Sequence, residues 1–207
     1  MVGFDITGLL RHSPRHRPGR AVLVLLAVML SPLYQTVVTP QEMSLPVGLQ
    51  VQFLFKILSF DRSQEVRLRK GVTVGVLHQS LVRSSYLAAE EFENAVTGSP
   101  ASFPGSVEVV RVEMGPEADL MRQLNALKVD VLYVAPMRSV EIRSVAEACR
   151  AQGILSFTGV EAYVREGVAV GVSRQGGKPV VLVNLTASRA AGSEFSSQLL
   201  RIAEVIE

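Results

Sequence analysis

The feature that most constrains this chain is a series of short, almost wholly apolar runs separated by stretches with helical spacing. The runs are residues 72–77 (VTVGVL), 107–112 (VEVVRV), 130–135 (DVLYVA) and 154–157 (ILSF). The runs over residues 72–77 and 130–135 are nearly all apolar and rich in valine, which is typical of strands buried on both faces of a parallel sheet, and the other two are also predicted to be strands. Parallel neighbours need a crossover between them, and intervening helices of ten to fifteen residues provide right-handed crossovers.

The stretches between and around these runs predict the helices. Helices are expected over residues 45–60, 81–96, 117–127, 139–152, 161–165 and 196–206. In the second of them, Leu81, Ala88, Phe92 and Val96 can share an apolar face. Residues 168–172 and 180–183 flank Gly176-Gly177, which predicts an antiparallel hairpin at the sheet edge. The fold class is therefore α/β: a single domain with a mostly parallel sheet flanked by helices and a C-terminal antiparallel hairpin.

The amino-terminal segment has the layout of an export signal. Residues 11–20 (RHSPRHRPGR) are basic, and residues 21–30 are ten unbroken apolar residues. The apolar run is shorter than the roughly 20 residues that cross a bilayer. No A-x-A cleavage triplet follows it, so an uncleaved anchor stays open. We expect residues 1–44 to be a signal peptide or anchor plus connector, residues 45–207 to be the folded domain, and the protein to be periplasmic or otherwise exported.

Charge and composition exclude several functions for the folded part. Of the 21 basic and 19 acidic residues, residues 1–40 hold four arginines and one aspartate, so the remainder has no basic excess to attract nucleic acid. Cys149 is the single cysteine, and His78 is the one histidine after residue 44. The sequence has no G-x-S-x-G elbow, phosphate-binding glycine loop or His/Cys metal spacing. We expect no catalytic residues, no metal, no cofactor and no nucleic-acid partner.

Two surfaces are candidates for binding. Ligands of open parallel sheets bind at the carboxyl ends of the strands, where the sequence places His78, Arg138 and Thr158. The alternative is that these segments are loops in which Ser80 and Ser139 cap the following helices.

A partner-binding surface is predicted from Phe53 and Phe55 in the first helix and from Arg174 and Gln175 at the hairpin tip. Aromatic residues often anchor interfaces. The alternative is that these two aromatics belong to the core. Phe53 lies off the apolar stripe of its helix and is the better surface candidate.

The carboxyl-terminal pieces also have a familiar order. Residues 154–172 read ILSFTGVEAYVREGVAVGV, and residues 181–205 read VLVNLTASRAAGSEFSSQLLRIAEV. This succession of strand, short helix, glycine, hairpin, Asn-Leu pair, Ala-Gly step and Ser-Ser-x-Leu-Leu helix resembles the YfiR/HmsC-like family of small periplasmic proteins. The resemblance extends more weakly over residues 47–206. The chain departs from the family where a Trp-Pro pair usually ends the first helix, since Phe60-Asp61 stands there. With Cys149 alone, it also cannot form the internal disulfide of some relatives.

The resemblance implies a periplasmic regulator that binds a membrane-anchored diguanylate cyclase, or a similar sensor protein, and holds it inactive. It leaves a homodimer open. The alternative function is the solute-binding component of a transport or sensor system, and a more distant one is a small hydrolase.

Overall fold

The computed structural model describes residues 43–64, 71–98, 105–115 and 118–206. The predicted export segment, with the connector up to residue 42, lies outside these residues. Within the described ranges, no helix is both long and apolar enough to span a bilayer.

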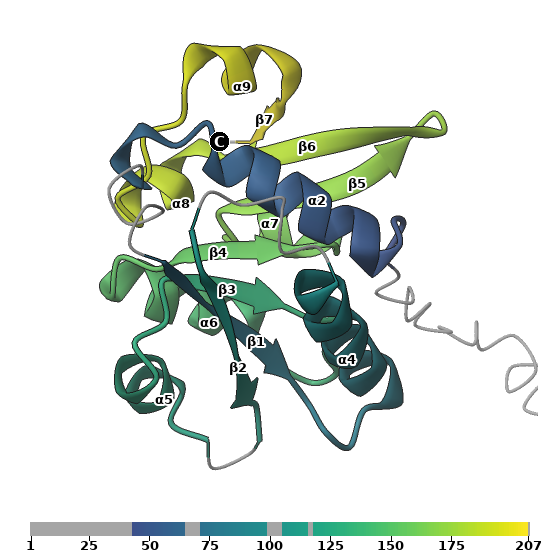
Figure 1. Ribbon diagram of the computed structural model, residues 1–207, viewed down its shortest axis with the longest axis vertical. Helices are drawn as coiled ribbons and strands as arrows, with labels where there is room; N and C mark the ends of the chain where they lie inside the picture. The colour runs from purple at the N-terminus through teal and green to yellow at the C-terminus, as the bar shows by residue number, and fades with distance from the viewer. Residues whose placement is uncertain (1–42, 65–70, 99–104, 116–117, 207) are drawn as a thin grey trace, which may run out of the picture. The chain divides into compact units, whose positions relative to one another are not determined.

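One seven-stranded sheet organises the domain, in the order β2-β1-β3-β4-β5-β6-β7 (Figure 1). Its strands are β1 (Val72–His78), β2 (Val107–Glu113), β3 (Val131–Val134), β4 (Leu155–Thr158), β5 (Val170–Gln175), β6 (Lys178–Asn184) and β7 (Glu204–Ile206). The pairing from β2 to β5 is parallel, β5 and β6 form an antiparallel hairpin, and β6 pairs with β7 in parallel. The predicted α/β class and the C-terminal hairpin are confirmed.

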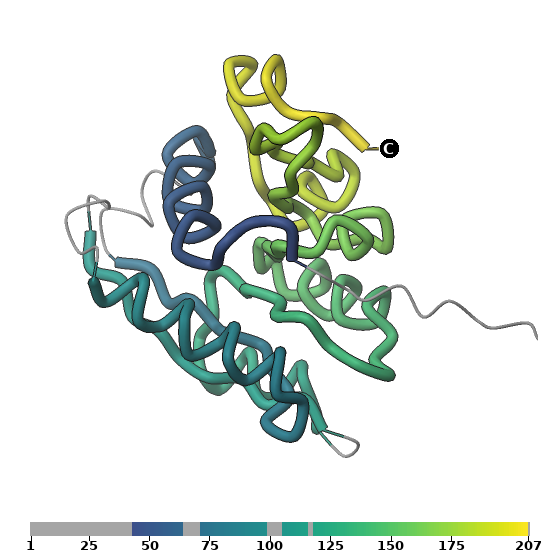
Figure 2. Tube along the Cα trace, turned by 90° about the vertical axis from the view of Figure 1, so that its right-hand side faces the viewer, coloured from purple at the N-terminus to yellow at the C-terminus, as the bar shows by residue number. Residues whose placement is uncertain are grey.

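The helices cover both faces of this sheet (Figures 1 and 2). They are α2 (Val47–Leu58), α4 (Arg83–Thr97), α5 (Leu120–Ala126), α6 (Ile142–Ala151), α7 (Glu161–Arg165), α8 (Leu185–Ala190) and α9 (Ser197–Ile202), with a short 3-10 turn η1 (Arg62–Gln64). The apolar side chains of α2 and α4 join one core cluster, and those of α5, α6 and α7 join the other.

Strand β3 shows why both layers are needed. Val131 and Tyr133 point into the core under α2 and α4, whereas Leu132 and Val134 point into the core under α5 and α6. None of these four side chains is more than 1 % exposed. Successive side chains of a strand point to opposite faces, so an all-apolar strand needs cover on both sides.

A buried polar contact fixes α2 on the sheet. Tyr133 Oη donates to Gln50 Oε1 at 3.1 Å, and Gln50 Nε2 donates to the Leu45 carbonyl at 2.8 Å. Gln50 is fully buried. Its amide lies against Gly159, where a β-carbon would overlap it. Tyr133 also stacks on Phe92 of α4, with 4.2 Å between ring centroids. One tyrosine thus joins β3 to both helices of this layer.

The predicted closing helix over residues 196–206 is wrong in its second half. Helix α9 ends at Ile202, Ala203 is extended (φ −88°, ψ 149°), and residues 204–206 form β7 beside β6. The strand follows from its β-branched Val205 and Ile206, which favour extended backbone. The hairpin consequently does not form the sheet edge, because β7 does. Two apolar side chains of this segment are exposed, Ile202 (70 %) and Val205 (41 %).

Ion pairs hold this end of the sheet to α7. Arg165 Nη2 lies 2.9 Å from Glu161 Oε1 and 3.4 Å from Glu204 Oε1. Ser173 of β5 donates to the other oxygen of Glu161 at 2.8 Å. The hydrogen bonds from Arg165 and Ser173 lower the pKa of the Glu161 carboxyl, so it is ionised near neutral pH.

We expect Tyr133→Phe to destabilise the protein by about 1–3 kcal/mol, because it leaves the buried Gln50 oxygen without its donor. Urea unfolding of the purified protein measures the change. Tyr86→Phe is the control, since Tyr86 is 39 % exposed and its loss of a hydroxyl should cost little. Equal losses for both variants would contradict this role of Tyr133.

Candidate functional site

A hollow lies where two neighbouring strands of the sheet send the chain into opposite helical layers. Helix α4 follows β1 into one layer, and α6 follows β3 into the other, although β1 and β3 are neighbours. A crevice at the carboxyl ends of the strands is expected at such a switch point. A pocket of about 1120 Å³ lies there, bounded by residues that follow β1, β2 and β3 and by α5 and α6. We call it the edge pocket.

Two linkers form walls of the edge pocket: residues 79–82 between β1 and α4, and residues 135–141 between β3 and α6. The sequence predicted that helices start in both. Helix α4 begins at Arg83 and α6 at Ile142, and neither start has a side-chain cap. The prediction that Ser80 and Ser139 cap these helices is therefore wrong. Both serines line the pocket instead. Ser139 adopts the left-handed backbone region (φ 54°), which bends the chain between β3 and α6.

A reciprocal pair of hydrogen bonds joins the two linkers. The Arg138 amide donates to Gln79 Oε1 at 2.7 Å, and Gln79 Nε2 donates to the Arg138 carbonyl at 3.1 Å. Below them, the buried Tyr163 accepts a bond from the Met137 amide at 2.8 Å, and burial raises the pKa of this phenol. The turn after β3 is thus held from both sides.

Glu113, at the end of β2, ties a third strand end to the pocket. Its Oε1 accepts from the amide and the hydroxyl of Ser80 at 3.0 and 2.8 Å, and its Oε2 lies 3.2 Å from His78 Nε2. His78 Nδ1 lies 3.1 Å from the Val112 carbonyl and 3.3 Å from the Val76 carbonyl. Carbonyl oxygens only accept, so Nδ1 carries a hydrogen.

These contacts separate the three predicted ligand residues. Arg138 lines the edge pocket, but His78 and Thr158 do not. His78 is buried below Glu113. The Thr158 hydroxyl donates to the Val134 carbonyl at 2.9 Å and accepts from the Val160 amide at 3.1 Å, so it joins β4 to β3 rather than facing a ligand.

Sequence reasoning missed most of the lining. Glu113 directly follows the predicted strand 107–112, so its place at the carboxyl end of a strand could have marked it as a site residue. Leu81 was assigned to the apolar face of its helix, but it precedes α4 and is 98 % exposed at the pocket. Met121 of α5 also lines the pocket and is 46 % exposed.

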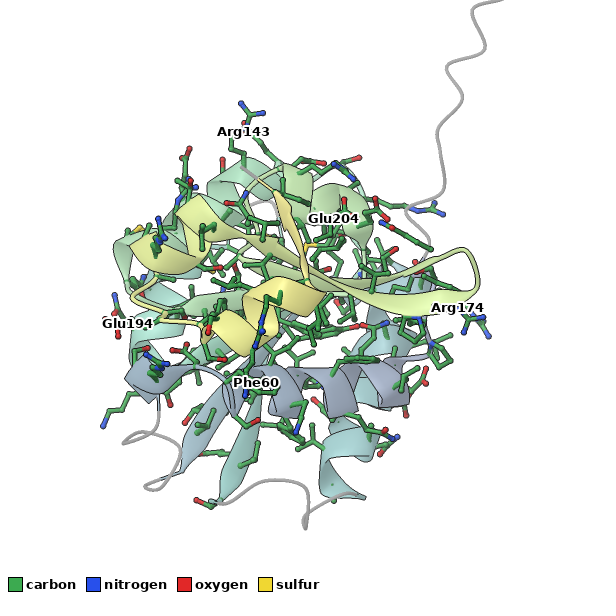
Figure 3. The ribbon with its side chains drawn as sticks, turned by 90° about the horizontal axis from the view of Figure 1, so that it is seen from above. Phe60, Arg143, Arg174, Glu194 and Glu204 are labelled. Atoms are coloured by element: carbon green, nitrogen blue, oxygen red, sulfur yellow. The ribbon has the colours of Figure 1, made fainter. Side chains whose placement is uncertain are left out.

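The predicted partner surface is divided by the fold. Phe55 is 4 % exposed within the core of α2, so its assignment to a surface is wrong. Phe53 is partly buried against the same core. Arg174 and Gln175 are exposed near the hairpin tip, where the Arg174 side chain projects outward (Figure 3). Gln175 Nε2 donates to Glu204 at 2.7 Å.

The thiol of Cys149 belongs to the core. It is 1 % exposed, in the cluster under α6. Burial raises its pKa to about 12, which keeps it protonated. Within the described ranges, no three His, Cys, Asp or Glu side chains are grouped so as to hold a metal ion.

Comparison with known families decides the relationship. The profile of the YfiR/HmsC-like family matches residues 48–204, which include strands β1 to β6 of the sheet. The chain belongs to the YfiR/HmsC-like family. This family consists of periplasmic regulatory proteins that interact with a partner protein. No curated protein matches the sequence.

Solved structures of three other proteins have a similar fold. An ABC domain in complex with L-Trp from Streptococcus pneumoniae is 16 % identical, with a TM-score of 0.53 over 78 % of this chain and 62 % of that chain. A conserved domain protein from Vibrio cholerae is 12 % identical, with a TM-score of 0.56 over 78 % and 60 %. A ligand-free, open substrate-binding protein with adhesive properties from Clostridium difficile is 16 % identical, with a TM-score of 0.51 over 73 % and 59 %. The YfiR/HmsC-like chain thus spans about 60 % of the length of these structures.

We expect Glu113→Ala to speed exchange of the Ser80 amide hydrogen about tenfold, because a hydrogen bond to a carboxylate is lost. Hydrogen–deuterium exchange resolved to residues 79–82 measures this. Glu108→Ala is the control, since Glu108 is exposed on the same strand. Unchanged protection of Ser80 would show that Glu113 does not order the linker.

We expect Cys149 to resist thiol reagents in the native protein at mildly alkaline pH, because the thiolate is the reacting form. Labelling with iodoacetamide, followed by mass spectrometry, measures it, and complete labelling in guanidinium chloride is the control. Rapid native labelling would contradict the buried, protonated thiol.

Proposed function

We propose that this YfiR/HmsC-like protein represses a membrane-bound diguanylate cyclase by binding its extracytoplasmic part. The observation that carries the proposal is the family match over residues 48–204. The basic and apolar layout of residues 11–30, typical of an export signal, supports the same compartment.

Repression of this kind needs no chemistry from the repressor. A bound protein shifts a two-state partner only by the ratio of its affinities for the two states. A preference of about tenfold corresponds to about 1.4 kcal/mol, which a few well-buried contacts supply. Phe53, Arg174 and Gln175 remain our proposals for part of that contact, while the burial of Phe55 removes it from the set.

The edge pocket favours a second candidate, the binding of a solute for a transport or sensor system. The pocket lies at the switch point where open α/β sheets bind ligands, and the similar folds include a substrate-binding protein and a domain in complex with L-Trp.

The mouth of the pocket argues against this second candidate. It is apolar and exposed, whereas a site for a small solute usually encloses the solute, so we prefer the first candidate.

We expect deletion of the gene to raise cyclic di-GMP and surface attachment, and an exported copy to reverse both, because the cyclase loses and regains its repressor. Mass spectrometry of nucleotide extracts measures cyclic di-GMP. A copy without residues 1–40 is the control and should not restore repression. Unchanged cyclic di-GMP with failed uptake of a solute would favour the second candidate.

A further inference from the structure

The edge pocket has an apolar interior that is open at its mouth. The apolar side chains in its lining come from both linkers, from the residue after β2 and from the facing helices α5 and α6; they include Leu81, Met114, Leu120, Met121, Val140 and Val145. At the mouth, Leu81 is 98 % exposed and Met121 is 46 % exposed. A contiguous apolar surface of this kind marks an interaction site rather than ordinary solvent-facing surface.

The charged part of the lining is mainly acidic. Its charged side chains are Glu113, Asp119, Glu141, Glu147 and Arg138. Arg122 and Arg150, outside the lining, form long surface salt bridges with Asp119 and Glu147, at 3.9 and 3.8 Å, whereas Glu141 forms no ion pair with a basic side chain of the described residues. The pocket therefore presents an apolar trough with a negative rim, and an occupant that complements it is apolar along one side and positively charged beside it.

We propose that the edge pocket binds a basic amphipathic helix of the protein's extracytoplasmic partner, a proposal that rests on the proposed function and names the chemistry of the partner. Two to three turns of a helix about 10 Å wide occupy a volume on the order of 1000 Å³, and the pocket measures about 1120 Å³. Helices commonly bind in apolar grooves through side chains at i, i+3, i+4 and i+7. Lysines or arginines beside that stripe would face Glu141, which precedes α6, and Glu147 on α6.

Other occupants fit the same observations less well. A second copy of the chain docked pocket to pocket would bring the same carboxylates together, since a two-fold interface pairs identical patches. An anionic lipid surface or nucleic acid would meet the same repulsion. A small amine would satisfy the rim but would leave the exposed Leu81 and Met121 uncovered.

The test uses a labelled model peptide of about 18 residues, made of leucine and lysine in amphipathic helical order. Fluorescence anisotropy with the purified protein measures its binding at low and high salt. Two peptides serve as controls: one replaces lysine by glutamate, and the other keeps the composition but alternates leucine and lysine, which destroys the helical stripe. We expect only the first peptide to bind well, and to bind more weakly at high salt.

Matched variants locate the site on the protein. Leu81→Ser with Met121→Ser should weaken binding at least tenfold, and Glu141→Gln with Glu147→Gln should weaken it several-fold. The controls are Leu87→Ser, at 45 % exposure on α4, and Glu90→Gln with Glu91→Gln on the same helix. Thermal unfolding of each variant checks that the fold is kept.

Binding that fails, or that the α4 controls weaken as much as the pocket variants, overturns the proposal. So does equal binding of the glutamate peptide, or a dimer in sedimentation that the pocket variants dissociate. Exported copies of the same variants separate this proposal from the proposed function. Normal repression by variants that no longer bind the peptide removes the edge pocket as the docking site but leaves the regulator intact. If the protein binds the peptide specifically but deletion of its gene leaves cyclic di-GMP unchanged, the edge pocket remains a helix-binding site and the proposed function is wrong.

Discussion

Burial of β1 and β3 on both faces is the constraint on which the rest of the structure depends. Leu132 and Tyr133 are neighbours in sequence, yet they enter cores on opposite sides of the sheet. The chain therefore has to send α4 to one layer and α6 to the other, and it does so from adjacent strands. A gap at the carboxyl ends of those strands follows from this divergence. The edge pocket is thus a consequence of the way in which the core is covered.

The gap is wide because both helices start late. Four residues separate His78 from α4, and α6 begins at Ile142, well beyond the end of β3 at Val134. The intervening linkers are ordered by side chains rather than by helical hydrogen bonds, through Gln79 on one linker and Glu113 on the neighbouring strand. Because these bonds exist before any partner arrives, docking at the edge pocket would cost little ordering of the walls.

The sequence predicted the parts of the fold that burial alone decides. All-apolar runs with valine specify double-sided strands, and the hairpin follows from Gly176-Gly177 between two such runs. The predictions that failed depend on tertiary context. Residues 204–206 form a strand because β6 offers an unpaired edge, and Leu81 is exposed because its helix begins after it. The ligand residues could not be ranked, since only the structure reveals that the Thr158 hydroxyl already bonds Val134.

The hairpin tip and the edge pocket both lie toward the carboxyl ends of the parallel strands. Strands β1, β3, β4 and β5 are parallel, so Gln175 at the end of β5 lies toward the edge where Glu113 closes β2. The hairpin extends past the end of β4, to which only Val170 and Gly171 of β5 pair (Figure 1), so Arg174 projects beyond the body of the sheet. In the proposed complex, a helix in the pocket would be one contact and Arg174 a second. Two separated contacts of this kind would favour a partner state that presents both together, and the proposed repression of a two-state enzyme requires that selectivity.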